Sequence, residues 1–108
     1  MTVFTVETYV VKPDKLGEFV AFVKNWKAWM KKRPELFKEM KSYKVYSNLL
    51  GGNWGGGAWM TEFDSLADVE KGFNKLMADK EFLTKMMPEW NALILPGTYS
   101  INVWTPLP

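Results

Sequence analysis

A central hairpin constrains the fold of this chain more than any other sequence feature. Two strand-like runs, Tyr43–Leu50 and Ala58–Asp64, flank the glycine-rich connection Gly51–Gly57. Alternating runs of β-branched and aromatic residues are typical of strands, and glycine permits the turns that a hairpin connection needs. Because a hairpin occupies the middle, the flanking segments have to supply the partner strands and the layer that covers them.

The flanking segments alternate between the two hydrophobic periodicities. The run Val3–Val11 alternates as a strand, and apolar spacing predicts a helix from Lys15 with Asp14 as its N-cap. Beyond the hairpin, Ser65 and Asp79 predict the starts of two further helical segments. A short helical turn is predicted over 35–40 and a last strand over 98–104.

The predicted order is therefore strand, helix, strand, strand, helix, strand, within one domain over residues 1–108. This order is typical of the α+β class and of a ferredoxin-like βαββαβ arrangement. Such a fold has a four-stranded antiparallel sheet with its helices on one face.

Histidine and cysteine are both absent from the sequence. Their absence excludes disulfides, thiol nucleophiles, thiolate or histidine metal sites and a Ser-His-Asp triad. The acidic residues do not follow the spacing of an EF-hand or of another metal site. We therefore expect neither a metal nor a cofactor.

Charge and hydropathy exclude some classes of binding partner. The net charge is +2, and the lysines are spread evenly rather than gathered in a basic stripe, so no nucleic-acid partner is expected. The first residues lack the basic region and cleavage site of a signal peptide. No apolar run approaches the roughly 20 residues that span a bilayer. We expect a cytoplasmic protein without a membrane partner.

The uncovered face of the predicted sheet indicates a homodimer. Hydrophobicity predicts that Phe4, Val6 and Val10 pack under the helices, which leaves Thr5, Glu7 and Tyr9 on the bare face. The other strands add residues of mixed character to that face, namely Tyr46, Asn48, Leu50, Ala58, Met60, Glu62, Ser100, Asn102 and Trp104. A dimer that stacks two such faces would form a barrel with a polar-lined cavity in each subunit.

Several short stretches occur in a characteristic order, namely 9–19, 62–66, 79–82 and 88–91, followed by Gly97 and Val103-Trp104. In this order they resemble the dimeric α/β barrel superfamily, particularly its NIPSNAP-like members. The resemblance covers nearly the whole chain and implies the same fold and a homodimer. One departure concerns the first strand, where Glu-x-Arg-x-Tyr is common in such members and this chain has Thr5-x-Glu7-x-Tyr9. Haem-degrading and chlorite-processing members use a histidine, so those activities do not transfer.

Two carboxylates are the candidate catalytic residues, Glu7 and Glu62. They belong to strands that this topology places side by side, and apolar surroundings would raise the pKa of at least one. The structural alternative is a solvated rim with lysine partners. The candidate ligand-binding residues offer hydrogen bonds or apolar contact to a phenol, quinone or carbonyl compound: Tyr9, Tyr46, Asn48, Met60 and Asn102.

Two function classes stay open. One is a cofactor-independent oxygenase or isomerase that acts on a small aromatic or carbonyl compound in the barrel cavity. The other is a module that binds a small ligand or mediates assembly without turnover, with Trp54 as a contact residue. The connection Gly51–Gly57 joins strand to strand and lacks the spacing of a phosphate-binding loop. We interpret it as a hairpin tip that exposes Trp54.

Overall fold

A twisted antiparallel sheet forms one layer of the protein, in a computed structural model that describes residues 2–52 and 54–108. The order of its strands is β2-β3-β1-β4, and each neighbouring pair is antiparallel. The bounds are Val3–Val10 for β1, Met40–Ser47 for β2, Gly56–Phe63 for β3 and Ser100–Trp104 for β4. The predicted ferredoxin-like sheet is confirmed.

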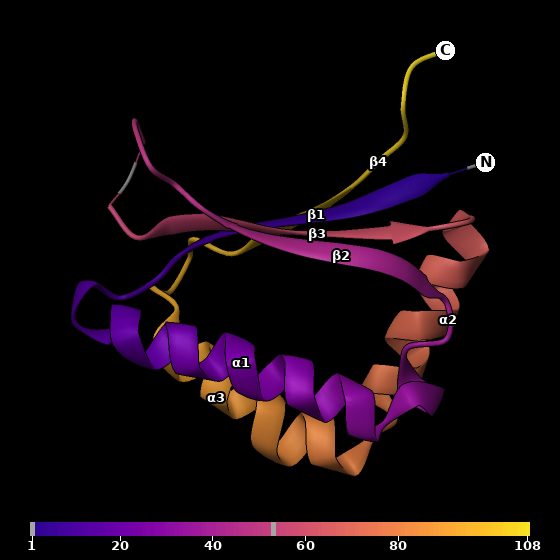
Figure 1. Ribbon diagram of the computed structural model, residues 1–108, viewed down its shortest axis with the longest axis horizontal. Helices are drawn as coiled ribbons and strands as arrows, with labels where there is room; N and C mark the ends of the chain where they lie inside the picture. Colours follow the sequence, from indigo (N-terminus) through magenta and orange to yellow (C-terminus); the bar gives the residue numbers. More distant parts are fainter. Residues whose placement is uncertain (1, 53) are drawn as a thin grey trace.

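Helices form the second layer, on one face of the sheet only (Figure 1). They are α1 (Leu16–Lys32), α2 (Leu66–Met77), the π-helical turn η3 (Phe82–Met86) and α3 (Met87–Leu93). In Figure 1, α1 and α3 run side by side beneath the sheet, and α2 lies at the end where α1 finishes. No helix of the described residues is long and apolar enough to span a bilayer.

Local capping signals locate two of the helical starts correctly. The Ser65 side chain accepts a hydrogen bond from the Asp68 backbone N–H at 3.2 Å, as an N-cap should. The Asp79 carboxylate accepts one from the Phe82 N–H at 3.0 Å. Asp14 does not cap α1, because it lies within a 3₁₀ turn, Pro13–Lys15, that precedes the helix.

The region predicted as a helical turn over 35–40 differs from the prediction. Pro34–Leu36 forms one 3₁₀ turn, and Met40 already begins β2. A register shift between Met40 and Ser42 marks an irregularity at the start of that strand. The pairing with β3 extends β2 at its beginning, while the strand ends at Ser47, earlier than the predicted Leu50.

The two faces of β1 are opposite to the sequence prediction. Glu7 pairs with Trp59 of β3, and Tyr9 and Trp59 pack together with the helices, so this side of β1 faces the helix layer. Val6 pairs with Met60 and lies on the open face, although it is only 4% exposed. Both faces of β1 are apolar enough to be buried, and hydrophobicity alone therefore selected the wrong one.

The hairpin connection extends beyond the sheet, on the side away from the helices (Figure 1). Gly51, Gly52 and Gly55 adopt positive φ angles, which glycine alone accommodates without strain. The side chain of Trp54 is 76% exposed, as predicted. Leu49 and Leu50, just before the turn, are also almost fully exposed. Asn53, within this connection, lies outside the described residues.

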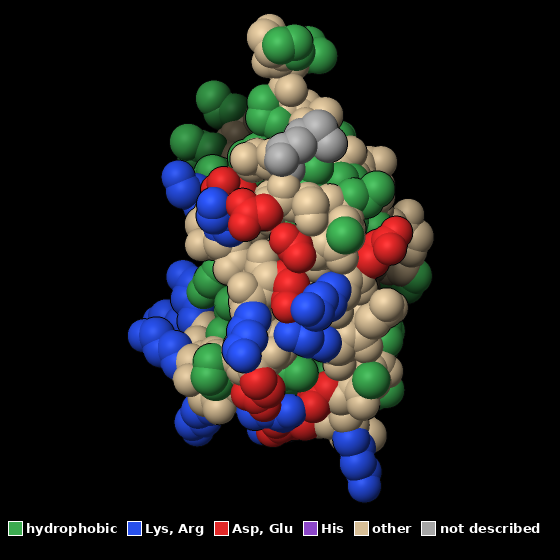
Figure 2. Space-filling model, turned by 90° about the vertical axis from the view of Figure 1, so that its right-hand side faces the viewer, with side chains coloured by type: hydrophobic (Ala, Val, Ile, Leu, Met, Phe, Trp, Pro, Cys, Tyr) green, Lys and Arg blue, Asp and Glu red, His purple; other side chains and the backbone are tan. Residues whose placement is uncertain are grey.

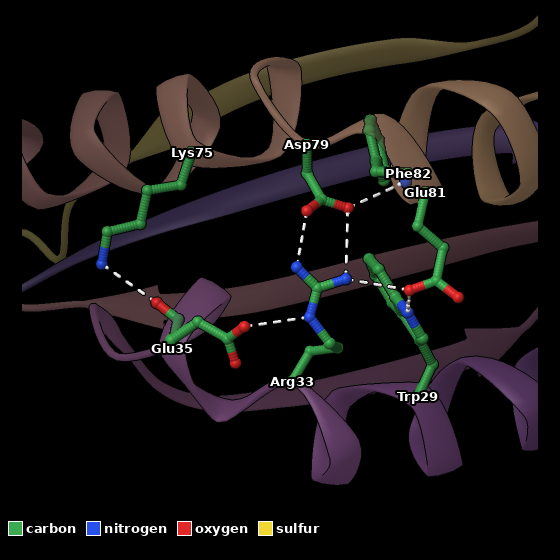
Figure 3. Close-up of polar contacts among 7 residues, drawn as sticks. All are labelled: Trp29, Arg33, Glu35, Lys75, Asp79, Glu81 and Phe82. Atoms are coloured by element: carbon green, nitrogen blue, oxygen red, sulfur yellow. Dashed lines mark hydrogen bonds and ion pairs between the residues drawn. The ribbon is translucent and has the colours of Figure 1, made fainter.

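A cluster of charged side chains fastens the end of α1 to the segment between α2 and η3 (Figure 3). The Arg33 guanidinium contacts Asp79 at 2.6 Å, Glu81 at 2.9 Å and Glu35 at 2.9 Å. Glu81 also accepts a 2.8 Å hydrogen bond from the indole N–H of Trp29. Because Asp79 also caps the helical segment that begins at Lys80, this cluster fixes the end of α1 relative to the start of that segment.

Candidate functional site

The helix layer and the sheet enclose a cavity of about 680 Å³. Its walls are aromatic and aliphatic side chains from both layers, with Trp59 from the sheet and Trp26 and Trp90 from the helices. A volume of this size is in the range of small-molecule sites in proteins. The sequence prediction put a cavity in each subunit on the other face of the sheet, enclosed by dimerisation, so the cavity under the helices is a new finding.

Glu7 is the polar group that stands out within this cavity. It lies on β1, directly across from Trp59 on one neighbouring strand and Ile101 on the other. The Tyr99 hydroxyl donates a hydrogen bond to Glu7 Oε1. Thr5 and Thr61, which face each other across β1 and β3, lie almost fully buried along the same wall. The site is thus a carboxylate-phenol pair in apolar surroundings.

Burial controls the ionisation of this pair. Loss of water raises the pKa of the Glu7 carboxyl above its ordinary value, and the hydrogen bond from Tyr99 offsets only part of this effect. The pKa of Tyr99 is also raised, by burial first and then by the negative charge of Glu7. Tyr99 therefore stays a hydrogen-bond donor, and Glu7 is a stronger base than a solvated carboxylate.

Several side chains that line the cavity are open to solvent. Tyr99 and Ile101, at the edge of the sheet formed by β4, are 43% and 36% exposed, respectively. Phe73 and Met77 of α2 also line the cavity and are 38% and 55% exposed. The lining is therefore in contact with solvent both at β4 and at α2.

Tyr9 extends the aromatic wall beside the pair. Its ring packs edge-on against Trp90, with 4.9 Å between ring centroids, and Trp90 packs edge-on against Tyr99 at 6.1 Å. A side chain at Gly57 would come within 2.9 Å of the Tyr9 ring, so glycine is required there. The Tyr9 hydroxyl is buried and has no hydrogen-bond partner among the described residues.

The structure separates the two predicted catalytic carboxylates. β1 and β3 are neighbours as expected, but Glu62 pairs with Phe4 and lies on the open face, opposite to Glu7. Glu62 is half-buried and accepts a 3.0 Å hydrogen bond from the Ser42 hydroxyl. The two carboxylates therefore cannot share one site within a subunit.

The other predicted ligand residues divide in the same way. Tyr9 faces the helix layer, whereas Met60 and Asn102 flank Val6 on the open face. Tyr46 and Asn48 line a shallow groove of about 590 Å³ near the hairpin connection, and Tyr9 lines this groove too rather than the larger cavity. The Asn48 side chain donates to the backbone oxygen of Gly51, so its amide caps the loop.

Tyr99 is the site residue that sequence reasoning missed. It stands two residues before Ile101, which pairs with Glu7, and is therefore a diagonal neighbour of Glu7 on the same face. The register of β4 against β1 would have revealed it. That register depends on contacts between residues 92 positions apart, which no local sequence pattern encodes.

Glu39 is the second carboxylate that lines the cavity, but it already has partners. Both of its oxygens accept hydrogen bonds from Lys75 at 2.9 Å, and Lys71 lies 3.9 Å away. The bond from Lys75 holds the pKa of Glu39 below its ordinary value. Within residues 2–52 and 54–108, no group of three or more acidic side chains could hold a metal ion.

Comparison with known proteins defines the fold more closely. No protein-family model matches the chain, and no curated protein matches it. Solved structures do match. A NIPSNAP family protein from Agrobacterium tumefaciens superposes with a TM-score of 0.75 at 16% identity, over 99% of this chain and 94% of that one. The suspected resemblance to NIPSNAP-like proteins is thus confirmed at the level of the fold.

Two further structures bear on assembly and activity. One is a dimeric protein of unknown function with a ferredoxin-like fold from Bacteroides fragilis, with a TM-score of 0.63, 15% identity, and 95% and 94% of the two chains covered. The other is an antibiotic biosynthesis monooxygenase, with a TM-score of 0.68, 13% identity, and 98% and 99% covered. At these identities the likeness concerns the fold.

Proposed function

We propose that the protein binds a small aromatic or carbonyl compound in the cavity between sheet and helices and transfers a proton to or from it. The observation that carries this proposal is the Glu7 carboxylate, held by Tyr99 inside an apolar cavity of about 680 Å³. Glu7 is the base, and the aromatic walls hold the flat part of the ligand.

The proposed step needs no cofactor. Glu7 removes a proton from carbon beside a carbonyl group, so the C–H bond breaks, an O–H bond forms on Glu7, and the electron pair moves to the carbonyl oxygen. Return of the proton at another position completes an isomerisation. An oxygenase would need dioxygen as a second substrate. A CH₂ group of the ligand would become a carbonyl group with one oxygen atom, and its two hydrogens would leave with the other oxygen atom as water, so the ligand itself supplies the electrons. The fold shared with a monooxygenase supports this second outcome.

Hydrogen–deuterium exchange of an enolisable aromatic ketone tests the base directly. β-Tetralone in D₂O should exchange its α-protons faster with the protein present, as followed by proton NMR. Glu7→Gln keeps the shape of the side chain and should reduce the accelerated rate by about 100-fold. Glu62→Gln, on the other face of the same sheet, is the matched control and should leave the rate unchanged.

The alternative function is a binding or assembly module without turnover. The exposed side chains at the hairpin tip, Leu49, Leu50 and Trp54, favour this alternative because a group of exposed apolar side chains is typical of a contact site. If β-tetralone binds but exchange is no faster than in buffer, or if Glu7→Gln exchanges as fast as the native protein, the enzyme proposal is wrong and the module remains.

We also propose that the protein is a homodimer joined through the open face of the sheet. That face carries apolar side chains, including Phe4, Val6 and Met60, and one similar fold is a dimeric protein. Figure 2 shows that Lys and Arg side chains gather mainly over the helix layer at the α2 end of the molecule. A charged helix layer and an apolar sheet favour the sheet as the interface.

A further inference from the structure

The charges around the cavity are unbalanced. Among the described residues that line it, Glu7 and Glu39 are the ionisable acids, and there is no lysine or arginine. Glu39 is neutralised by Lys75 and Lys71, which lie outside the lining. Glu7 has only the neutral hydroxyl of Tyr99 as a partner among the described residues. One carboxylate is therefore left without a counter-ion.

The walls around that carboxylate suit a positive charge. Trp26, Trp59, Trp90 and Phe82 contribute to the lining, and the rings of Trp59 and Trp90 meet edge to face at 6.2 Å. The face of an aromatic ring carries negative potential and attracts an ammonium group within about 6 Å. An anion placed in the same cavity would meet Glu7 and the ring faces without a compensating charge.

From this arrangement we infer that the ligand is an aromatic compound with a protonated amine, and that its ammonium group is the counter-ion of Glu7. The inference rests on the proposed function in placing the ligand in this cavity. The inference specifies one further property of that ligand, its positive charge. An ammonium group beside Glu7 also stabilises the carboxylate form, which is the form that a base requires.

Three probes with one aromatic framework test the inference at neutral pH: benzylamine, benzyl alcohol and benzoate. Binding is measured by titration calorimetry with the native protein. Benzylamine should bind about ten-fold more tightly than benzyl alcohol, because it gains an ion pair and a cation–π contact. Benzoate should bind more weakly than either.

Three variants identify Glu7 as the source of the preference. Glu7→Gln should bring the affinities for benzylamine and benzyl alcohol close together, whereas Glu62→Gln should keep the native ratio. Ile101→Lys places an ammonium group directly across from Glu7, at the β4 edge of the cavity. It should remove the preference for benzylamine while Glu7 stays in place, so the test does not depend on one substitution.

The outcomes separate the two proposals. If benzyl alcohol binds as tightly as benzylamine, or if neither Glu7→Gln nor Ile101→Lys changes their ratio, the cationic ligand is wrong and the cavity remains a site for neutral compounds. If none of the three probes binds, and β-tetralone does not bind either, both the inference and the proposed function are wrong.

Discussion

At the scale of single residues, the proposed chemistry depends on the ionisation of Glu7. The folded protein holds a proton on this carboxyl more tightly than the unfolded chain, because burial raises its pKa from the ordinary 4.5. The stability that Glu7 contributes to the folded protein is therefore lost as the pH rises from about 4.5 through the pKa of Glu7 in the folded protein.

Glu7→Gln tests this linkage. Gln keeps the shape and still accepts the hydrogen bond from Tyr99, but it does not ionise. The variant should therefore gain stability relative to the native protein at about pH 8 compared with about pH 4. Urea unfolding of both proteins at each pH measures the difference. A difference that is the same at both pH values, or smaller at the higher one, would contradict the burial of Glu7.

At the scale of elements, the sequence predicts features that depend on neighbouring residues, such as helix caps, but not features that depend on contacts between distant strands. The caps Ser65 and Asp79 were predictable because each acts on a backbone N–H three residues away. The face of β1 was not predictable, because Phe4 and Val6 look more suited to a core than Thr5 and Glu7 do. The sheet buries both sets, and only the register with β3 and β4 distinguishes them.

Asp79 joins the end of α1, through Arg33, to the helical segment before α3, so its removal should destabilise the protein. Asp79→Ala loses the cap of the helical segment that begins at Lys80 and frees Arg33 from one partner, so we expect a loss of about 1 kcal/mol or more in the free energy of unfolding. Asp64→Ala is the control, since Asp64 is exposed and pairs only with Lys41, at 3.0 Å, among the described residues. Its effect should stay below about 0.5 kcal/mol.

Chemical denaturation of the native protein and of the two alanine variants measures these differences in the free energy of unfolding. Equal stabilities for Asp79→Ala and Asp64→Ala would show that the cluster in Figure 3 does not hold the helix layer together.

At the scale of the whole molecule, the two faces of the sheet have separate tasks. The helix-facing side builds the cavity, with Glu7 and Trp59 opposite each other. The open side carries Val6 between Met60 and Asn102 and is proposed as the dimer interface. The predicted fold was therefore right, and the predicted faces of β1 were wrong, because hydrophobicity does not distinguish an interface from a core.

Met60→Glu tests the interface. A charge at the centre of the open face would be buried without a partner in a sheet-to-sheet dimer, so this variant should be monomeric where the native protein is dimeric. Val20→Glu is the control, because Val20 is an exposed apolar residue of α1, 55% exposed in the helix layer. Light scattering after size-exclusion chromatography gives the masses. A native protein that is itself monomeric, or a dimeric Met60→Glu variant, would exclude this interface.

The most direct measurement of the central claim is the response of the tryptophan indole N–H signals to β-tetralone, in ¹H–¹⁵N NMR spectra. Trp26, Trp59 and Trp90 line the cavity, whereas Trp54 and Trp104 are 76% and 56% exposed, outside it. If the cavity between sheet and helices is the ligand site, the first three signals shift on titration and the last two stay in place. Shifts confined to Trp54 and Trp104 would place the ligand on the open face or the hairpin tip and would contradict the account.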